Sequence, residues 1–241
     1  MRAIERLQLQ ILTCTRCPRL VAYRAQVARE KRRQYRDWDY WGKPLPSFGD
    51  PQGRLLLIGL APAAHGGNRT GRMFTGDQSG EWVYGTLHRF GFANQPTAHH
   101  REDGLRLHDA YITAAARCVP PDNKPARQEL EACRPYLIRE LHLLRNVGVV
   151  VPLGKIAFDA YLAARRELGL PLVHPRPHFA HGAETRLPEG PLLLASYHPS
   201  RQNTQTGRLT QAMFDAIFAR ARAELDAAVP SPSGHRRQVK G

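Results

Sequence analysis

The sequence predicts an α/β fold, a three-layer α/β/α sandwich around a central, mainly parallel, four-stranded sheet. Short apolar runs alternate with amphipathic helical segments along the chain, which is typical of parallel strands joined by helices that cover both faces of a sheet. Hydrophobic residues make up 42% of the 241 residues, enough to bury one core of this kind.

Four apolar runs predict the strands, at residues 54–60, 109–116, 147–153 and 192–197. The first run is followed by Gly59, Pro62 and Gly66, so we expect a buried strand that leads into a long loop. Six segments predict the helices: 4–12, 18–36, 80–91, 127–145, 154–168 and 209–227.

Ligands of open α/β sheets bind beyond the carboxyl ends of the strands. The loops after the first, second and fourth predicted strands begin near Ala61, Cys118 and His198, and their compositions are unusual. We therefore expect these three loops to converge on one cleft.

The ordered part of the chain is expected to form a single domain over residues 1–228. From residue 229 to residue 241, Pro, Ser, Gly and basic residues dominate, which predicts a disordered basic tail.

The net charge is +14, from 35 Lys and Arg against 21 Asp and Glu. Such a balance indicates an acidic partner, most simply nucleic acid, although an Arg-rich genome also produces basic proteins. No apolar run approaches the roughly 20 residues of a membrane helix, and the charged N-terminus does not resemble a secretion signal. We expect a cytoplasmic protein with no membrane partner.

The chain has four cysteines: Cys14, Cys17, Cys118 and Cys133. The first two form a C-x-x-C motif, and thiols stay reduced in a cytosolic protein, so structural disulfides are not expected. Four thiolates suit either tetrahedral zinc or a [4Fe–4S] cluster, and the spacing does not separate these alternatives. A third interpretation is four unrelated buried cysteines.

The segment 59–77 is rich in glycine, which lets backbone approach a ligand closely. Phe74 is an aromatic side chain in this loop and is available to stack on a base. Asp77 is a carboxylate near the start of the next helix. The alternative is a flexible loop that ends with Asp77 as a helix cap.

Three motifs and the cysteines together match a known family. The motifs are G-L-A-P-A-A-H-G-G-N-R-T-G-R-M-F-T-G-D at 59–77, D-N-K-P at 122–125 and Y-H-P-S-R-Q-N at 197–203. The chain resembles family 5, the B-type, of the uracil-DNA glycosylase superfamily from about residue 14 to about residue 225. The resemblance implies an iron–sulfur base-excision-repair enzyme whose cofactor is a [4Fe–4S] cluster on Cys14, Cys17, Cys118 and Cys133.

The same resemblance implies that the enzyme is a monofunctional glycosylase. It would flip the base out of DNA and hydrolyse its N-glycosidic bond to leave an abasic site. The expected partner is double- or single-stranded DNA that contains deaminated bases, bound by a monomer.

Base recognition is assigned by the resemblance to two side chains and one stretch of backbone. Phe74 would stack on the flipped base, and Asn123 would hydrogen-bond its edge, because an amide both donates and accepts. Backbone groups of Gly59, Leu60 and Ala61 would add further contacts. Taken without the motif, Asn123 is also a plausible turn residue.

His198 and Asp77 are the expected catalytic partners of Asn123. His198 would donate to the uracil O2 as negative charge develops there, although the sequence does not say whether the imidazole is neutral or charged. Better-known uracil-DNA glycosylases carry a polar side chain in the loop after the first strand, whereas residues 60–64 are apolar here. We therefore assign to Asp77 the role of orienting the water. The alternative for His198 is a structural loop histidine.

The loop after His198 is expected to enter the DNA minor groove, through Ser200, Arg201 and Gln202. The aromatic segment 38–41 is interpreted as packed surface and not as a platform for bases.

The apolar loop also predicts a tolerant pocket, which would accept hypoxanthine, xanthine or ethenocytosine beside uracil. Three alternatives stay open: a strict uracil enzyme of the sister family 4, a non-catalytic iron–sulfur DNA-binding relative, and an iron–sulfur electron-transfer protein.

Overall fold

The computed structural model describes residues 1–228, so the tail predicted over 229–241 lies outside the described residues. Within these residues the strands form one mixed sheet, in the order β1-β3-β2-β4-β6-β5. The strands are β1 (Phe48–Gly49), β2 (Leu55–Gly59), β3 (Ala110–Ala114), β4 (Val149–Pro152), β5 (Glu184–Arg186) and β6 (Leu192–Leu194).

The four predicted strands are confirmed as β2, β3, β4 and β6, which pair in parallel at the centre of the sheet. The predicted number of four was wrong, because β1 and β5 add antiparallel edges and make six strands within residues 1–228. Strand β1 has only two residues, and β5 is a polar, largely exposed segment. Neither has the apolar run that identified the central strands, so pairing with a neighbour alone makes them strands.

All six predicted helices are present, and two short ones join them. The helices are α1 (Ala3–Leu12), α2 (Pro18–Glu30), α3 (Gly67–Thr70), α4 (Gln78–Arg89), α5 (Arg127–Leu143), α6 (Lys155–Glu167), α7 (Arg201–Gln205) and α8 (Gln211–Ala227), with 3-10 turns η1 (Arg33–Tyr35) and η2 (Pro121–Asn123). The helix predicted to reach residue 36 ends at Glu30, because Lys31 takes a positive φ of 50°.

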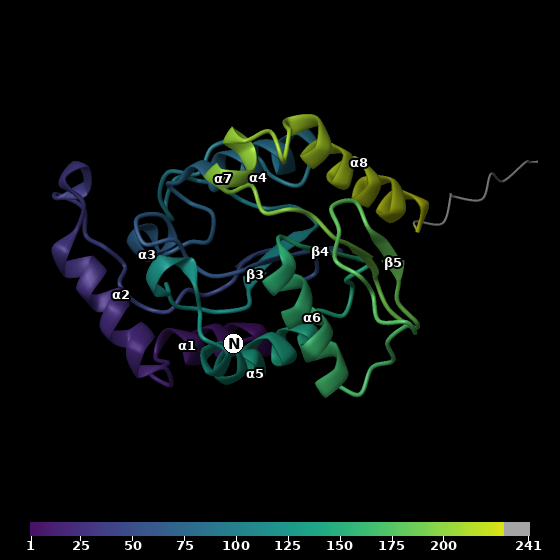
Figure 1. Cartoon of the computed structure of the whole chain (residues 1–241), viewed down its shortest axis with the longest axis horizontal. Coiled ribbons are helices and arrows are strands. Elements are labelled where there is room, and N and C mark those ends of the chain that lie inside the picture. The colour runs from purple at the N-terminus through teal and green to yellow at the C-terminus, as the bar shows by residue number, and fades with distance from the viewer. Residues whose placement is uncertain (229–241) are drawn as a thin grey trace, which may run out of the picture.

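Two layers of helices cover the sheet, which confirms the α/β/α sandwich. Figure 1 shows α4, α7 and α8 on one side of the strands and α1, α5 and α6 on the other. Side chains alternate along β2: Leu55 and Leu57 join the core under α4 and α8, while Leu56 and Ile58 join the core under α1, α5 and α6. Among residues 1–228, no helix combines the length and the apolar character needed to cross a membrane.

The carboxyl ends of the parallel strands lie at one edge, where the loops of interest begin. The amide of Ala115 donates to Gly59 and that of Ala116 donates to Leu60, so the loops after β2 and β3 leave side by side. Across β4 and β6, the Gly154 amide donates to the carbonyl of Ser196. The loops that begin near Ala61, Cys118 and His198 therefore start from the same end of the sheet, which the predicted convergence on one cleft requires.

Candidate active site and cysteine cavity

Phe74 projects from the glycine-rich loop onto the end of β2. Its side chain is buried and its backbone has a φ of +53°, a conformation that costs a non-glycine residue energy. A Cβ on Gly59 would lie 3.0 Å from the Phe74 ring, so only glycine at the end of β2 lets the ring approach so closely. The loop therefore holds Phe74 in a constrained position.

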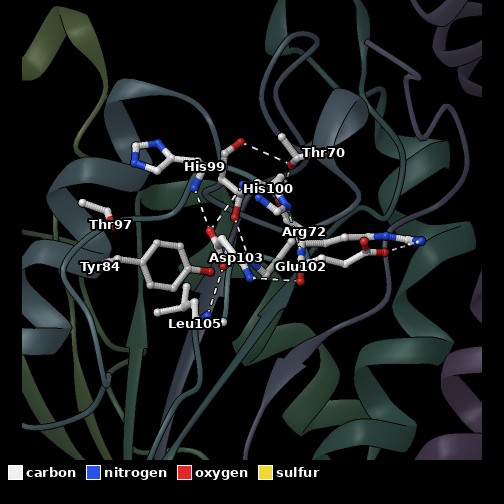
Figure 2. A network of polar contacts seen from close by, with 12 residues as sticks. Thr70, Arg72, Tyr84, Thr97, His99, His100, Glu102, Asp103 and Leu105 are labelled. Atoms are coloured by element: carbon white, nitrogen blue, oxygen red, sulfur yellow. Dashed lines mark hydrogen bonds and ion pairs between the residues drawn. The ribbon is translucent and has the colours of Figure 1, made fainter.

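A buried polar network holds the segment that immediately precedes Phe74. The Tyr84 hydroxyl donates to the Met73 carbonyl at 2.8 Å. Arg72 donates to both carboxylate oxygens of Asp103, at 2.9 and 2.7 Å (Figure 2). Burial would raise the pKa of Asp103, but hydrogen bonds from Arg72 and from backbone amides outweigh it and lower that pKa to about 2. The Arg72–Asp103 ion pair thus stays charged at all physiological pH values.

Asp77 is the N-cap of α4. One of its oxygens accepts a hydrogen bond from the Gly80 amide at 2.9 Å, which confirms the helix-cap interpretation of this carboxylate. The other oxygen lies against Gly66, where a Cβ would come within 2.0 Å of it. Burial raises the pKa of Asp77, and the opposing Gly80 hydrogen bond and Arg69 charge only moderate that shift. A cap role and a catalytic role are compatible, since each uses a different oxygen.

Two aromatic side chains that precede the sheet in sequence pack against an arginine of the same glycine-rich loop. The Arg69 guanidinium lies 3.9 Å from the ring centroid of Tyr35 and 4.1 Å from that of Trp38. Arg69 also donates to the carbonyls of His65, at 2.7 Å, and Gly76, at 3.0 Å. The interpretation of segment 38–41 as packed surface is thus confirmed for Trp38, which stacks on the arginine that closes the loop before Asp77.

His198 brings the loop after β6 to the loop after β2. Its ring centroid lies 6.0 Å from that of Phe74, with the two planes inclined at 38°. Burial lowers the pKa of His198 to about 4, so the imidazole is neutral at neutral pH. Within residues 1–228 desolvation is the sole cause of this shift, and no hydrogen bond to the ring opposes it.

Two contacts fix the His198 loop beside α4. The Ser79 hydroxyl donates to the Pro199 carbonyl at 2.9 Å, and the Arg201 Nε donates to the Gln78 side chain at 3.1 Å. Ser200 caps α7 by accepting from the Asn203 amide. Arg201 and Gln202 are exposed at the first turn of that helix.

Asn123 is placed differently from the other predicted residues. It ends η2 with a φ of +56°, and its side chain is exposed, whereas that of Phe74 is buried. Its neighbour is anchored, because Arg19 binds Glu129 through two hydrogen bonds of 2.7 Å and also donates to the Lys124 carbonyl at 3.2 Å.

Of the predicted backbone contacts, two carbonyls are already used. Gly59 and Leu60 accept hydrogen bonds from Ala115 and Ala116, which extend the β2–β3 pairing. A base at this edge would therefore meet the half-buried Ala61 and the groups that follow it.

The four cysteines line a single cavity between the N-terminal helices and the sheet. Cys14 and Cys17 flank the turn before α2, Cys118 follows β3, and Cys133 lies on α5; all four are free thiols. In the described part of the chain, no three His, Cys, Asp or Glu side chains approach closely enough to hold one metal ion. The thiols thus surround a space and do not converge on a point.

Hydrogen-bond donors surround the same cavity. Arg24 Nη1 donates to the Cys118 sulfur at 2.9 Å, and the Arg117 amide donates to the Cys133 sulfur at 3.3 Å. Arg24 is only 8% exposed, a burial that the basic composition of its helix does not reveal. The missed signal was its spacing, because Leu20, Arg24 and Val27 fall on one helical face.

Comparison with known proteins agrees with this fold and these motifs. Residues 46–222 match the family described as "Uracil DNA glycosylase superfamily". The chain therefore belongs to the uracil-DNA glycosylase superfamily.

Individual relatives show to which family of this superfamily the chain belongs. The type-5 uracil-DNA glycosylase of Thermus thermophilus is 52% identical over 216 residues, covering 89% of this chain and 95% of its own length. That of Mycobacterium leprae is 48% identical over 91% of this chain and 95% of its own. A type-4 uracil-DNA glycosylase of Pyrobaculum aerophilum is 28% identical over 66% of this chain. Within the superfamily, the chain is a member of the type-5 family.

Proposed function

We propose that this protein is a base-excision-repair glycosylase that hydrolyses the N-glycosidic bond of uracil and other deaminated bases in DNA. The observation that carries the proposal is the meeting of Phe74 and His198 where the parallel strands end, with Asp77 following Phe74 in the same loop. An aromatic face, a neutral N–H donor and a carboxylate are the groups that this reaction needs.

In this proposal the flipped base stacks on Phe74. His198 donates to the uracil O2 as charge moves onto the departing base, and its lowered pKa supports a neutral donor. Asp77 orients the water through the oxygen that does not cap α4. Asn123 reads the base edge; because its side chain is exposed in the free protein, we expect it to gain its partners from the ligand.

DNA is the proposed partner, bound by a monomer in the cytoplasm. Arg201 and Gln202 are exposed next to the His198 loop, and the net charge of +14 favours contact with phosphates. The absence of a polar side chain at 60–64 leaves fewer groups to reject a wrong base, so we include hypoxanthine, xanthine and ethenocytosine among the substrates.

A [4Fe–4S] cluster is the proposed cofactor, held by Cys14, Cys17, Cys118 and Cys133. Four thiols around one cavity suit a multi-atom cluster better than a single zinc ion, which needs its ligands about 2.3 Å from one point. Amide and guanidinium hydrogen bonds to the sulfurs are typical of iron–sulfur sites. The cluster is assigned a structural role, because it would join the N-terminal helices to the sheet.

The test is a single-turnover assay on oligonucleotides that carry uracil or hypoxanthine, with alkali to cut any abasic site. Cleavage of both is expected. Cleavage of uracil alone would contradict the broad specificity and favour a strict enzyme of the type-4 kind. No cleavage by protein with intact visible absorbance would overturn the proposed activity and favour a non-catalytic DNA-binding protein.

A further inference from the structure

Arg24 is a buried cation on α2 whose side-chain partners belong to the cysteine cavity. Its Nη1 donates to the Cys118 sulfur at 2.9 Å, and its two Nη atoms lie 3.4 and 3.3 Å from the Cys14 carbonyl. It makes no ion pair with any carboxylate of residues 1–228, although it is only 8% exposed.

A second buried arginine beside the cavity provides a contrast. Arg117 is 2% exposed and pairs with Glu140, which also accepts from Thr113 at 2.5 Å. Its positive charge is therefore balanced within the protein. That of Arg24 is not, and a buried charge without a counter-charge is strongly unfavourable.

Neutral thiols do not balance a guanidinium. Four cysteine thiolates carry more negative charge than an iron–sulfur core carries positive charge, so the assembled site would have a net negative charge. The counter-charge that Arg24 lacks is therefore supplied when the cluster is present.

We infer that Arg24 is a positioning residue for the iron–sulfur cluster: it balances the cluster's negative charge and orients Cys118 by hydrogen bonding to its sulfur. The inference rests on the proposed cofactor. Because reduction adds one more negative charge, a nearby cation stabilises the reduced cluster more than the oxidised one. Arg24 should accordingly slow cluster loss and raise its reduction potential.

The experiment compares Arg24→Gln and Arg24→Lys with Arg29→Gln in the full-length protein purified with its cluster. Arg29 lies on the same helix but is exposed, so it is a matched control. Three quantities are measured: iron and sulfide per chain, the rate of cluster loss to an iron chelator, and the reduction potential from visible absorbance.

We expect Arg24→Gln to lose its cluster several-fold faster than Arg29→Gln and to have a lower reduction potential. Arg24→Lys keeps the charge and should lie closer to the wild type in both respects. Arg24→Gln behaving like Arg29→Gln in content, loss rate and potential would overturn the inference.

Two further outcomes are decisive. If Arg24→Gln does not fold, Arg24→Lys decides. Should Arg24→Lys lose its cluster as fast as a protein that lacks one of the four cysteines, the positive charge would not be what matters, and the inference would be overturned. Wild-type protein without iron would overturn the cofactor proposal itself, together with the role of Arg24. Glycosylase activity enters none of the three readouts, so failure of the proposed activity is distinguished from failure of this inference.

Discussion

At the scale of single residues, the site depends on groups held in unfavourable states by their surroundings. Phe74 has a positive φ, a strain of about 1–3 kcal/mol that persists only where neighbours enforce it. Tyr84 and the Arg72–Asp103 pair enforce it here by fixing the adjacent backbone. Desolvation keeps His198 neutral and raises the pKa of the half-buried Asp77. Strain and desolvation gathered around one point are typical of a functional site.

Asp77 should determine the acid limb of the pH–rate profile. Its carboxylate must be ionised to orient water, and burial raises its pKa, so the single-turnover rate should fall on acidification at a higher pH than for an ordinary Asp. His198, with a pKa of about 4, is already neutral at neutral pH, where the limb begins its descent from full activity.

Asp77→Asn should lower the rate by about 10²- to 10⁴-fold and flatten the limb, while Asn preserves the cap of α4. Glu81→Gln, at an exposed position on the same helix, is the control and should keep both rate and limb. Full activity of Asp77→Asn would exclude Asp77 from catalysis.

At the scale of elements, the segment that bears Asn123 is attached at several points. It runs from Cys118 to Cys133, both of which line the cysteine cavity. Between them, the bond of Arg19 to Glu129 and to the Lys124 carbonyl joins the segment to the first turn of α2. An exposed side chain such as that of Asn123 can be presented in one orientation only if the backbone below it is held in this way.

Breaking the Arg19–Glu129 pair should therefore weaken base recognition without removing the cluster. Arg19→Met and Glu129→Gln are expected to lower the single-turnover rate roughly tenfold to a hundredfold, because small displacements of a binding group cost that much. Amide hydrogen exchange over residues 119–126 should rise in parallel, and visible absorbance should stay unchanged.

The control for this experiment is Arg127→Met. Arg127 pairs with Glu131 on the same helix, but the pair is exposed and should contribute little. Equal effects of Arg19→Met and Arg127→Met on hydrogen exchange and rate would refute the anchoring role.

At the scale of the whole molecule, the two ends of the parallel strands carry different parts of the chain. The four parallel strands bring four loops to the end of the sheet where their carboxyl termini lie. Helix α6 starts at this end, after β4, and runs back, so its last turn lies near the opposite end of the strands. Positive charge is abundant across the chain, and only the charge near the carboxyl ends of the strands is expected to meet phosphates.

The salt dependence of DNA affinity should distinguish basic residues at the carboxyl ends of the strands from those at the opposite end. The logarithm of DNA affinity should fall linearly with the logarithm of salt concentration, by about 0.9 per phosphate contact. Arg201→Ala should reduce that slope by about 1, while Arg166→Ala, exposed in the last turn of α6, should leave it unchanged. Binding titrations at several salt concentrations measure the slope for each variant. Equal slopes for Arg201→Ala and Arg166→Ala would mean that Arg201 of α7 does not contact the DNA phosphates.

Local pattern was sufficient for the central sheet, for the six long helices and for the shared starting point of three loops. Strands β2, β3, β4 and β6 are short apolar runs, and period and apolar content depend on neighbours in the sequence alone. The motifs at 59–77 and 197–203 were likewise visible, because each is a continuous segment.

Long-range packing accounts for what local pattern left out. Strands β1 and β5 exist only because a neighbour pairs with them, and Asp103 meets Arg72 across 31 positions of sequence. Whether His198 is neutral and whether Arg24 is buried depend on the groups that exclude water from them, and those groups come from distant segments. Desolvation and pairing are properties of the assembled fold, so the pKa values, the cysteine cavity and its buried cation became visible only in three dimensions.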